Sequence, residues 1–398
     1  MSVDLVINKR FLREFSRIYQ REIEGTAFCP YRVCPLGAHS DFQKGKVTGF
    51  AIDKGINIAY SKNADGHVNI ASLQFEKKVA FHLDSIPPKK QNDWADYLRG
   101  AVIILSEDHK LNNGIDCIID GELPIGGISS SASVIIAFLL AICEANSIKL
   151  TQKEIIDIAL KSENNYVGIS CGILDQSCEI YSKEDCLLYL DTLDRSYELI
   201  PASGNMKPYE IAIFYSGVDK PKDGSQFNIR VDECRSAAYV LKAYAGIEYG
   251  QFKDTFLRDV PRSCFDTFKN KMPKNFMLRA KHWYEEFERV ETGTEAWRRG
   301  DMETFGKLIF DSGQSSIQNW NTGSTELILL YEIMKNTDGI YGGRISGAGF
   351  KGCCMAIIDP TYRDYIEESV TKQYTEYYPK LKDKFSISFC KSSDGVKL

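Results

Sequence analysis

The chain has 398 residues, of which 43% are hydrophobic and 26% charged, so it is long enough for one large or two medium cores. Its net charge of −5 gives no strong basic field, which argues against nucleic acid or an anionic membrane surface as its main partner. The longest apolar run, Val134–Cys143, is too short to cross a bilayer and predicts a buried helix.

The 12 cysteines are scattered and form no metal-like pair of CxxC units. Residues 1–10 do not read as a signal peptide, so we expect free thiols in a reducing, cytoplasmic setting. The sequence leaves the oligomeric state open.

Hydrophobic periodicity predicts the first elements. Asn8–Ile23 places Phe11, Phe15 and Ile18 on one face of an amphipathic helix, and Phe50–Tyr60 alternates like a strand. Next come a strand at Gly114–Asp120, a Gly/Ser turn at Pro124–Ser131, a helix at Ala132–Asn146, and a helix opened by the capping box Thr151/Glu154 that reaches about Tyr166.

The second half mixes strands and helices without strict alternation, which predicts an α+β fold. We expect strands at Cys186–Asp191, Glu210–Tyr215 and Cys353–Ile358, helices at Asp232–Ala245 and Pro273–Gly300, and a glycine-rich loop at Gly339–Gly352. The composition of Pro201–Pro208 indicates a boundary near residues 190–205, hence domains 1–200 and 201–398.

A glycine–serine loop, Pro124-Ile-Gly-Gly-Ile-Ser-Ser-Ser-Ala132, lies between a predicted strand and an apolar helix. Glycines let a ligand approach the backbone, and a helix start offers N–H groups and a positive dipole end. The loop therefore predicts an anion site, with serine hydroxyls as further donors, one of which could bind Mg²⁺. It matches neither a Walker A sequence nor GxGxxG, and a plain turn capping a core helix is the alternative.

Two carboxylates fall in apolar surroundings. Glu163 follows Ile156 and Leu160 on the core-facing stripe of its helix, so it needs a partner, either a metal ion or a basic side chain. Asp175 lies in Cys171-Gly-Ile-Leu-Asp-Gln176, where it could accept a hydroxyl proton near a phosphate site or simply cap a helix.

A polar cluster occurs near the N-terminus in Tyr31-Arg-Val-Cys-Pro-Leu-Gly-Ala-His-Ser-Asp41. His39 and Asp41 are suited to sugar hydroxyls, and Arg32 to the charge on a transferring phosphoryl group. A surface turn is the alternative interpretation.

Taken in order, these segments resemble the GHMP kinase signatures. Pro30–Asp41 resembles the sugar-binding signature of galactokinases, Pro124–Ser133 the phosphate loop, and Ile345–Cys354 the third, glycine-rich motif. Ser162–Gln176 is similar to the segment carrying the metal-binding Glu and the catalytic Asp, and Trp94–Gly100 to the one whose Trp lies on adenine. The resemblance covers about residues 28–355.

The resemblance implies a two-domain GHMP kinase fold, with an N-terminal domain like ribosomal protein S5 domain 2 and a ferredoxin-like C-terminal domain. It implies ATP and Mg²⁺ as cofactors and a small sugar or sugar acid as the partner. By position, Asp175 would be the base and Arg32 would steady it, while Ser131 and Glu163 would hold Mg²⁺. Sugar contacts would come from Ala38, His39, Asp41, Cys171, Gly172 and Phe227, and nucleotide contacts from Trp94, Pro124, Gly126, Gly127, Ser129, Ser130, Ser131, Gly347 and Gly349.

Departures from the galactokinase pattern bear on the substrate. Galactokinases carry Glu at the position of Ala38, where it accepts a bond from the sugar's 6-hydroxyl, and Phe227 replaces a Tyr. Alanine removes a negative charge that a C6 carboxylate would meet, so the change favours galacturonate, as does a resemblance to plant galacturonokinases. Galactose, glucuronate and a non-catalytic sugar sensor remain the alternatives. Candidate cations for the carboxylate are Lys44, Lys46 and Lys220.

Two smaller departures leave the predicted catalytic groups in place. The phosphate loop is one residue shorter than in typical galactokinases, and Lys351 replaces a glycine of the third motif. Lys351 could add positive charge near phosphates or face solvent.

Overall fold

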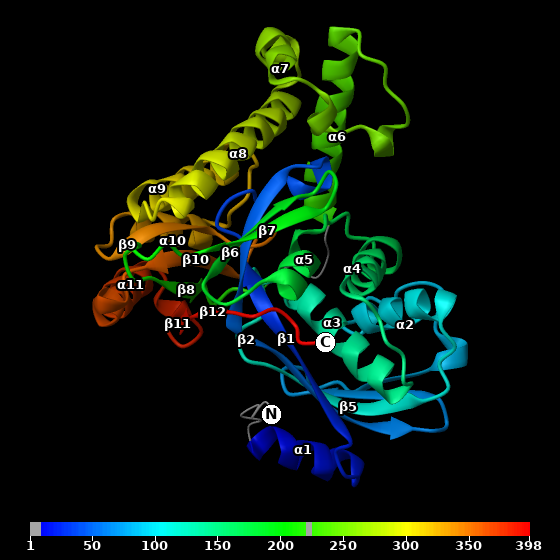
Figure 1. Cartoon of the computed structure of the whole chain (residues 1–398). Coiled ribbons are helices and arrows are strands. Elements are labelled where there is room, and N and C mark those ends of the chain that lie inside the picture. The colour runs from blue at the N-terminus through cyan, green and yellow to red at the C-terminus, as the bar shows by residue number, and fades with distance from the viewer. Residues whose placement is uncertain (1–8, 220–224) are drawn as a thin grey trace.

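The computed structural model describes residues 9–219 and 225–398, which form two β-sheets and the helices that cover them (Figure 1). The larger sheet has the order β4-β3-β5-β2-β6-β7, and β1 and β12 also pair with the long strand β2. Its pairs are antiparallel apart from β3 with β5. Its strands are β1 (Gly25–Val33), β2 (Lys46–Asn63), β3 (His67–Ser72), β4 (Val79–His82), β5 (Gly114–Gly121), β6 (Cys186–Asp191), β7 (Ser196–Pro201) and β12 (Ser392–Ser393).

The two faces of this sheet are buried separately, as alternation along β2 requires. Ile58 and Tyr60 belong to the main core, whereas Ala59 packs under α1 (Lys9–Tyr19) with Phe11 and Phe15. Helices on the main-core side are α2 (Asp96–Asp108), α3 (Ser130–Ala145), α4 (Gln152–Lys161) and α5 (Leu174–Tyr181).

The smaller sheet has the order β11-β8-β10-β9 and is antiparallel throughout. Alternate residues of its strands face α10 and α11 on one side and the main core on the other, so the two sheets share apolar packing. Its elements are β8 (Glu210–Tyr215), β9 (Ile340–Ile345), β10 (Cys353–Ile358), β11 (Ser386–Cys390), α9 (Met302–Gln318), α10 (Thr325–Lys335) and α11 (Arg363–Tyr377).

Three further helices extend away from both sheets in Figure 1, namely α6 (Ser225–Ala245), α7 (Arg262–Phe268) and α8 (Lys274–Arg298). They have an apolar cluster of their own, which includes Trp283 and Trp320. The N-terminal half of α8 reaches this cluster, and its C-terminal half packs into the main core through Val290 and Trp297.

Most predicted elements are confirmed, and three strands, β6, β8 and β10, have the predicted bounds. One prediction is wrong: Ile340–Ile345 is strand β9, so only residues 346–352 form the expected loop. The capping box of Thr151 and Glu154 is present, but its helix ends at Lys161 and continues as a π-helical turn, Ser162–Val167. Asn8 lies outside the described residues.

The division into domains 1–200 and 201–398 remains a proposal, supported by the end of β7 at Pro201 and the start of the second sheet at Glu210. Ser392–Ser393 return to pair with β2, so the last residues complete the first sheet. All 12 cysteines are free, and no helix in the described residues is long and apolar enough to span a membrane.

Candidate active site

Almost all of the predicted site residues line one cavity of about 370 Å³. It is formed by the chain after β1, the turn before α3, the segment from the π-helical turn to α5, the start of α6 and the β9–β10 loop. The predicted residues that line it are Arg32, Ala38, His39, Asp41, Gly126, Gly127, Ser129, Ser130, Ser131, Glu163, Cys171, Gly172, Asp175, Phe227, Gly347 and Gly349.

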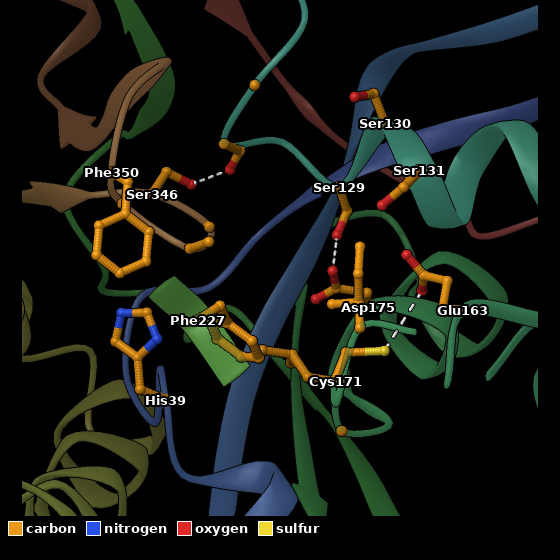
Figure 2. A pocket seen from close by; sticks show the side chains of 18 of the residues that line it. His39, Ser129, Ser130, Ser131, Glu163, Cys171, Asp175, Phe227, Ser346 and Phe350 are labelled. Carbon is orange, nitrogen blue, oxygen red and sulfur yellow. Dashed lines mark hydrogen bonds between the residues drawn. The ribbon is translucent and has the colours of Figure 1, made fainter. Parts of the chain in front are cut away.

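Asp175 and Arg32 form a partly buried ion pair at the centre of the cavity. Arg32 Nε donates to Asp175 Oδ1 at 2.8 Å, and Nη2 lies 2.7 Å from the same oxygen. Burial opposes the charge on Arg32, but the carboxylate outweighs it and raises the pKa of the guanidinium. Ser129 Oγ donates to the other oxygen, Asp175 Oδ2 (Figure 2). Asp175 is therefore held as an oriented acceptor that opens on the cavity.

The glycine–serine loop adopts the conformation expected of an anion cradle. Gly126, Gly127 and Ser129 have φ values of 125°, 89° and 62°, so the loop uses left-handed backbone immediately before α3 begins at Ser130. The first N–H groups of a helix lack intrahelical acceptors, and the residues that carry them here, Ser130 and Ser131, line the cavity. Ser129, the residue before α3, makes no side-chain capping hydrogen bond, which favours the predicted anion site over a turn that only caps the helix.

The third glycine-rich segment closes on the first loop. Ser346 Oγ donates to the carbonyl of Gly127 at 2.5 Å (Figure 2). A Cβ atom on Gly347 would lie 2.8 Å from Gly127 Cα, so the two backbones approach too closely for any side chain there. The distant motifs therefore form one continuous wall.

Glu163 and Ser131 offer oxygen donors that suit Mg²⁺. Glu163 is 3% exposed and accepts a hydrogen bond from Gln176 Nε2 at 2.6 Å. Figure 2 shows its carboxylate on the same side of Asp175 as the Ser131 hydroxyl, at the start of α3. Mg²⁺ commonly takes one or two protein oxygens and completes its shell with water and phosphate oxygens, so the donor set fits the ion.

Asp41 and Gly172 form a second polar contact inside the cavity. The Asp41 carboxylate accepts the N–H of Leu174 at 3.1 Å, and a Cβ atom on Gly172 would lie 2.2 Å from Asp41 Oδ2. Burial raises the pKa of Asp41 to about 6, although the Leu174 N–H acts in the opposite direction. A sugar hydroxyl in the cavity could donate a further hydrogen bond to this carboxylate.

His39 lies on the opposite wall with aromatic neighbours (Figure 2). Its ring stacks on Trp320 with centroids 4.8 Å apart and lies 6.4 Å from Phe227. Burial lowers the pKa of His39 well below its usual value, which keeps the imidazole neutral. A neutral ring that is fixed by stacking can present one donor and one acceptor to a ligand.

Two predicted nucleotide contacts do not line this cavity. Trp94 instead stacks on Phe75 with ring centroids 5.3 Å apart, and Pro124, the first residue of the glycine–serine loop, is exposed. The predicted cations also lie elsewhere: Lys44 sits 4.1 Å from the Phe256 ring centroid, and Lys46 pairs with Glu291 at 2.8 Å. Lys220 is outside the described residues.

Several lining residues were not predicted. Lys90 donates to the carbonyl of Val167 at 2.9 Å, Asn228 bridges the backbone of Gly168 and Ser170, and Arg344 lines the wall beside the third loop. Lys90 and Asn228 lie in segments with no pattern of their own. Arg344 directly precedes the third motif, which was the one available signal for it.

Known proteins resemble this chain along most of its length. The family models for the N-terminal and C-terminal domains of GHMP kinases match residues 96–183 and 294–376. The chain is 36% identical to a galacturonokinase of Arabidopsis thaliana, covering 93% of this chain and 92% of the relative. It is 29% identical to a galactokinase of Clostridium acetobutylicum, covering 96% and 97%.

Solved structures agree on the fold. A galactokinase of Lactococcus lactis, crystallised with galactose, superposes with a TM-score of 0.87 at 24% identity over 98% of both chains. A mevalonate kinase of Methanococcus jannaschii has a TM-score of 0.63 at 18% identity, covering 92% and 98%. Two GHMP kinase domain models match the chain, and a relative that is 36% identical covers 93% of it. The protein therefore belongs to the GHMP kinase family.

Proposed function

We propose that the protein is an ATP-dependent sugar 1-kinase that converts D-galacturonate to galacturonate 1-phosphate. The observation that carries the substrate assignment is Ala38, which lines the cavity beside His39 where galactokinases have a glutamate. The 36% identity to a galacturonokinase along most of the chain supports the same assignment.

The proposed reaction is a direct transfer of the γ-phosphoryl group to the anomeric oxygen. Arg32 and Ser129 each hold one oxygen of Asp175, which fixes the orientation of the carboxylate. In this orientation Asp175 accepts or polarises the proton of the anomeric hydroxyl. Arg32 and the N–H groups at the start of α3 offset the phosphate charge. Ser131 and Glu163 would hold Mg²⁺, which supplies further charge neutralisation when bound.

A panel of sugars tests the assignment. ADP release from ATP, with Mg²⁺, should be fastest on D-galacturonate, and slower on D-galactose and D-glucuronate. Equal or better turnover on galactose would contradict the substrate proposal and favour galactokinase activity, which the relatives at 29–30% identity suggest.

Replacing Ala38 provides the matched variant. Ala38→Glu places a carboxylate against the substrate's own, so kcat/KM for galacturonate should fall about a hundredfold and that for galactose should rise. Unchanged preference would count against the role of Ala38. Binding of sugar and ATP with no turnover on any sugar would instead identify a sensor.

A further inference from the structure

The basic side chains of the cavity differ in whether the protein itself already binds them. Among the described residues, the lysines and arginines that line the cavity are Arg32, Lys90, Arg344 and Lys351. Arg32 is held by a carboxylate, Lys90 by a backbone carbonyl, and Arg344 by two serine hydroxyls. Lys351 makes no hydrogen bond and no ion pair with any part of the chain that the structure describes. It is therefore the cation whose donors are open to a ligand.

The acidic neighbour of Lys351 is Glu326, in the first turn of α10. Burial opposes the charge on Glu326, but hydrogen bonds from Ser324 and Thr325, together with the charge of Lys351, lower its pKa. The attraction acts without an ion pair between the two side chains. The ammonium group of Lys351 thus keeps its three donors.

The backbone next to Lys351 is fixed against the glycine–serine loop. A Cβ atom on Gly352 would lie 2.7 Å from the carbonyl carbon of Gly126, so the two chains are in direct contact. The Gly352 carbonyl accepts the Ser216 N–H at 2.9 Å and the Ser216 hydroxyl at 2.7 Å. Lys351 therefore leaves the backbone at a point held beside the proposed phosphate cradle, and its side chain lines the same cavity.

The glycine–serine loop has no positive side chain of its own. Residues 124–132 contain neither lysine nor arginine, so a phosphate chain there would meet only N–H and hydroxyl donors from the loop. In P-loop enzymes, a lysine of the loop itself reaches the β- and γ-phosphates. Here the one lysine seated against the loop comes from the segment before β10, among the residues that the structure describes.

We propose that Lys351 is a nucleotide-binding residue that donates to the phosphate chain of ATP and so supplies the positive charge that the glycine–serine loop lacks. Charge-assisted hydrogen bonds to phosphate oxygens are stronger than the neutral ones that the loop can offer. The inference rests on the proposed ATP-dependent function and adds a residue to its nucleotide site.

Binding of a non-hydrolysable analogue, β,γ-imido-ATP with Mg²⁺, tests the inference by calorimetry without turnover. Lys351→Met keeps most of the side chain and removes the charge, so Kd for the analogue should rise about tenfold. Lys351→Gln, a second neutral variant, should match it, whereas Lys351→Arg should stay within about threefold of the parent. In both neutral variants, Kd for galacturonate should stay within about twofold of the parent.

Glu326→Gln is the matched control, because it removes the acidic neighbour and leaves the lysine in place. Its Kd for the analogue should equal the parent value or fall below it. A rise as large as that in Lys351→Met would show that the pair matters for structure, and would overturn the proposal.

An unchanged Kd for the analogue in both neutral variants would also overturn it. So would weaker binding of galacturonate alone, which would assign the cation to the sugar carboxylate. A parent protein that does not bind the analogue would overturn the proposed function and this inference together. A parent that binds it, with neutral variants that bind it equally well, would overturn the inference alone.

Discussion

Gly172 provides a steric test of the sugar side of the cavity. An alanine Cβ at this position would lie 2.2 Å from Asp41 Oδ2 and 2.3 Å from Asp41 Cγ, distances that real Cβ atoms do not show. Gly172 does not use left-handed backbone, so the substitution acts through these contacts and not through φ. The same Cβ would lie 2.7 Å from the backbone nitrogen of Phe42, so the chain after Asp41 must shift as well. Asp41 must move, and its bond from the Leu174 N–H, 3.1 Å in the parent, is lost.

The magnitude follows from that lost contact. A hydrogen bond to a charged group contributes about 1.5–3 kcal/mol, so Gly172→Ala should weaken sugar binding about tenfold to a hundredfold. Initial rates should show a raised KM for the sugar with KM for ATP within about twofold of the parent. Gly250→Ala is the control, since a Cβ there meets nothing within 4 Å. A Gly172→Ala enzyme with an unchanged sugar KM would refute the placement of Asp41 as a substrate contact.

Two further predictions concern the same cavity. Gln176→Leu removes the amide Nε2 that donates to Glu163 at 2.6 Å, together with an Oε1 that is buried without a hydrogen-bond partner. KM for Mg²⁺ should therefore rise about tenfold, while KM for the sugar stays unchanged. A Mg²⁺ titration of the initial rate checks this, and an unchanged KM contradicts it. Because burial raises the pKa of Asp41 from 3.8 to about 6, its carboxylate protonates as the pH falls below 6. The value of kcat/KM for the sugar should then fall about tenfold per pH unit, whereas a flat profile down to pH 5 would contradict that role.

Local patterns were enough to predict the elements that follow regular periodicity. The strands β6, β8 and β10 are short apolar runs between turn residues, and α3 is an apolar helix after a glycine turn. Strand β9 was missed because Gly342 and Gly343 suggested a loop. A Cβ on Gly342 would lie 2.2 Å from the carbonyl oxygen of Gly306 on α9, so the glycine permits close helix–strand packing that no single segment reveals.

The same limit applies to the site. Ordered motifs predicted that Arg32, Asp175 and the glycine–serine loop would share one cavity, because each motif carries chemistry of its own. One set of buried ion pairs could not be predicted: Glu286 of α8 lies 2.7 Å from Arg289 and 3.5 Å from Arg344. Glu286 and Arg289 read as ordinary charges on a long helix, and only the packing of α8 against the chain after β1 buries them together.

Substitution of Asp175 by Asn tests the central claim most directly. The amide keeps the shape and can still bond Ser129, but it cannot accept the anomeric proton, so kcat should fall at least a hundredfold. Calorimetry on the same variant should find ATP and galacturonate bound within about fivefold of the parent affinities. ADP release by Asp175→Asn at the parent rate would show that this carboxylate is not the base and would overturn the proposed mechanism.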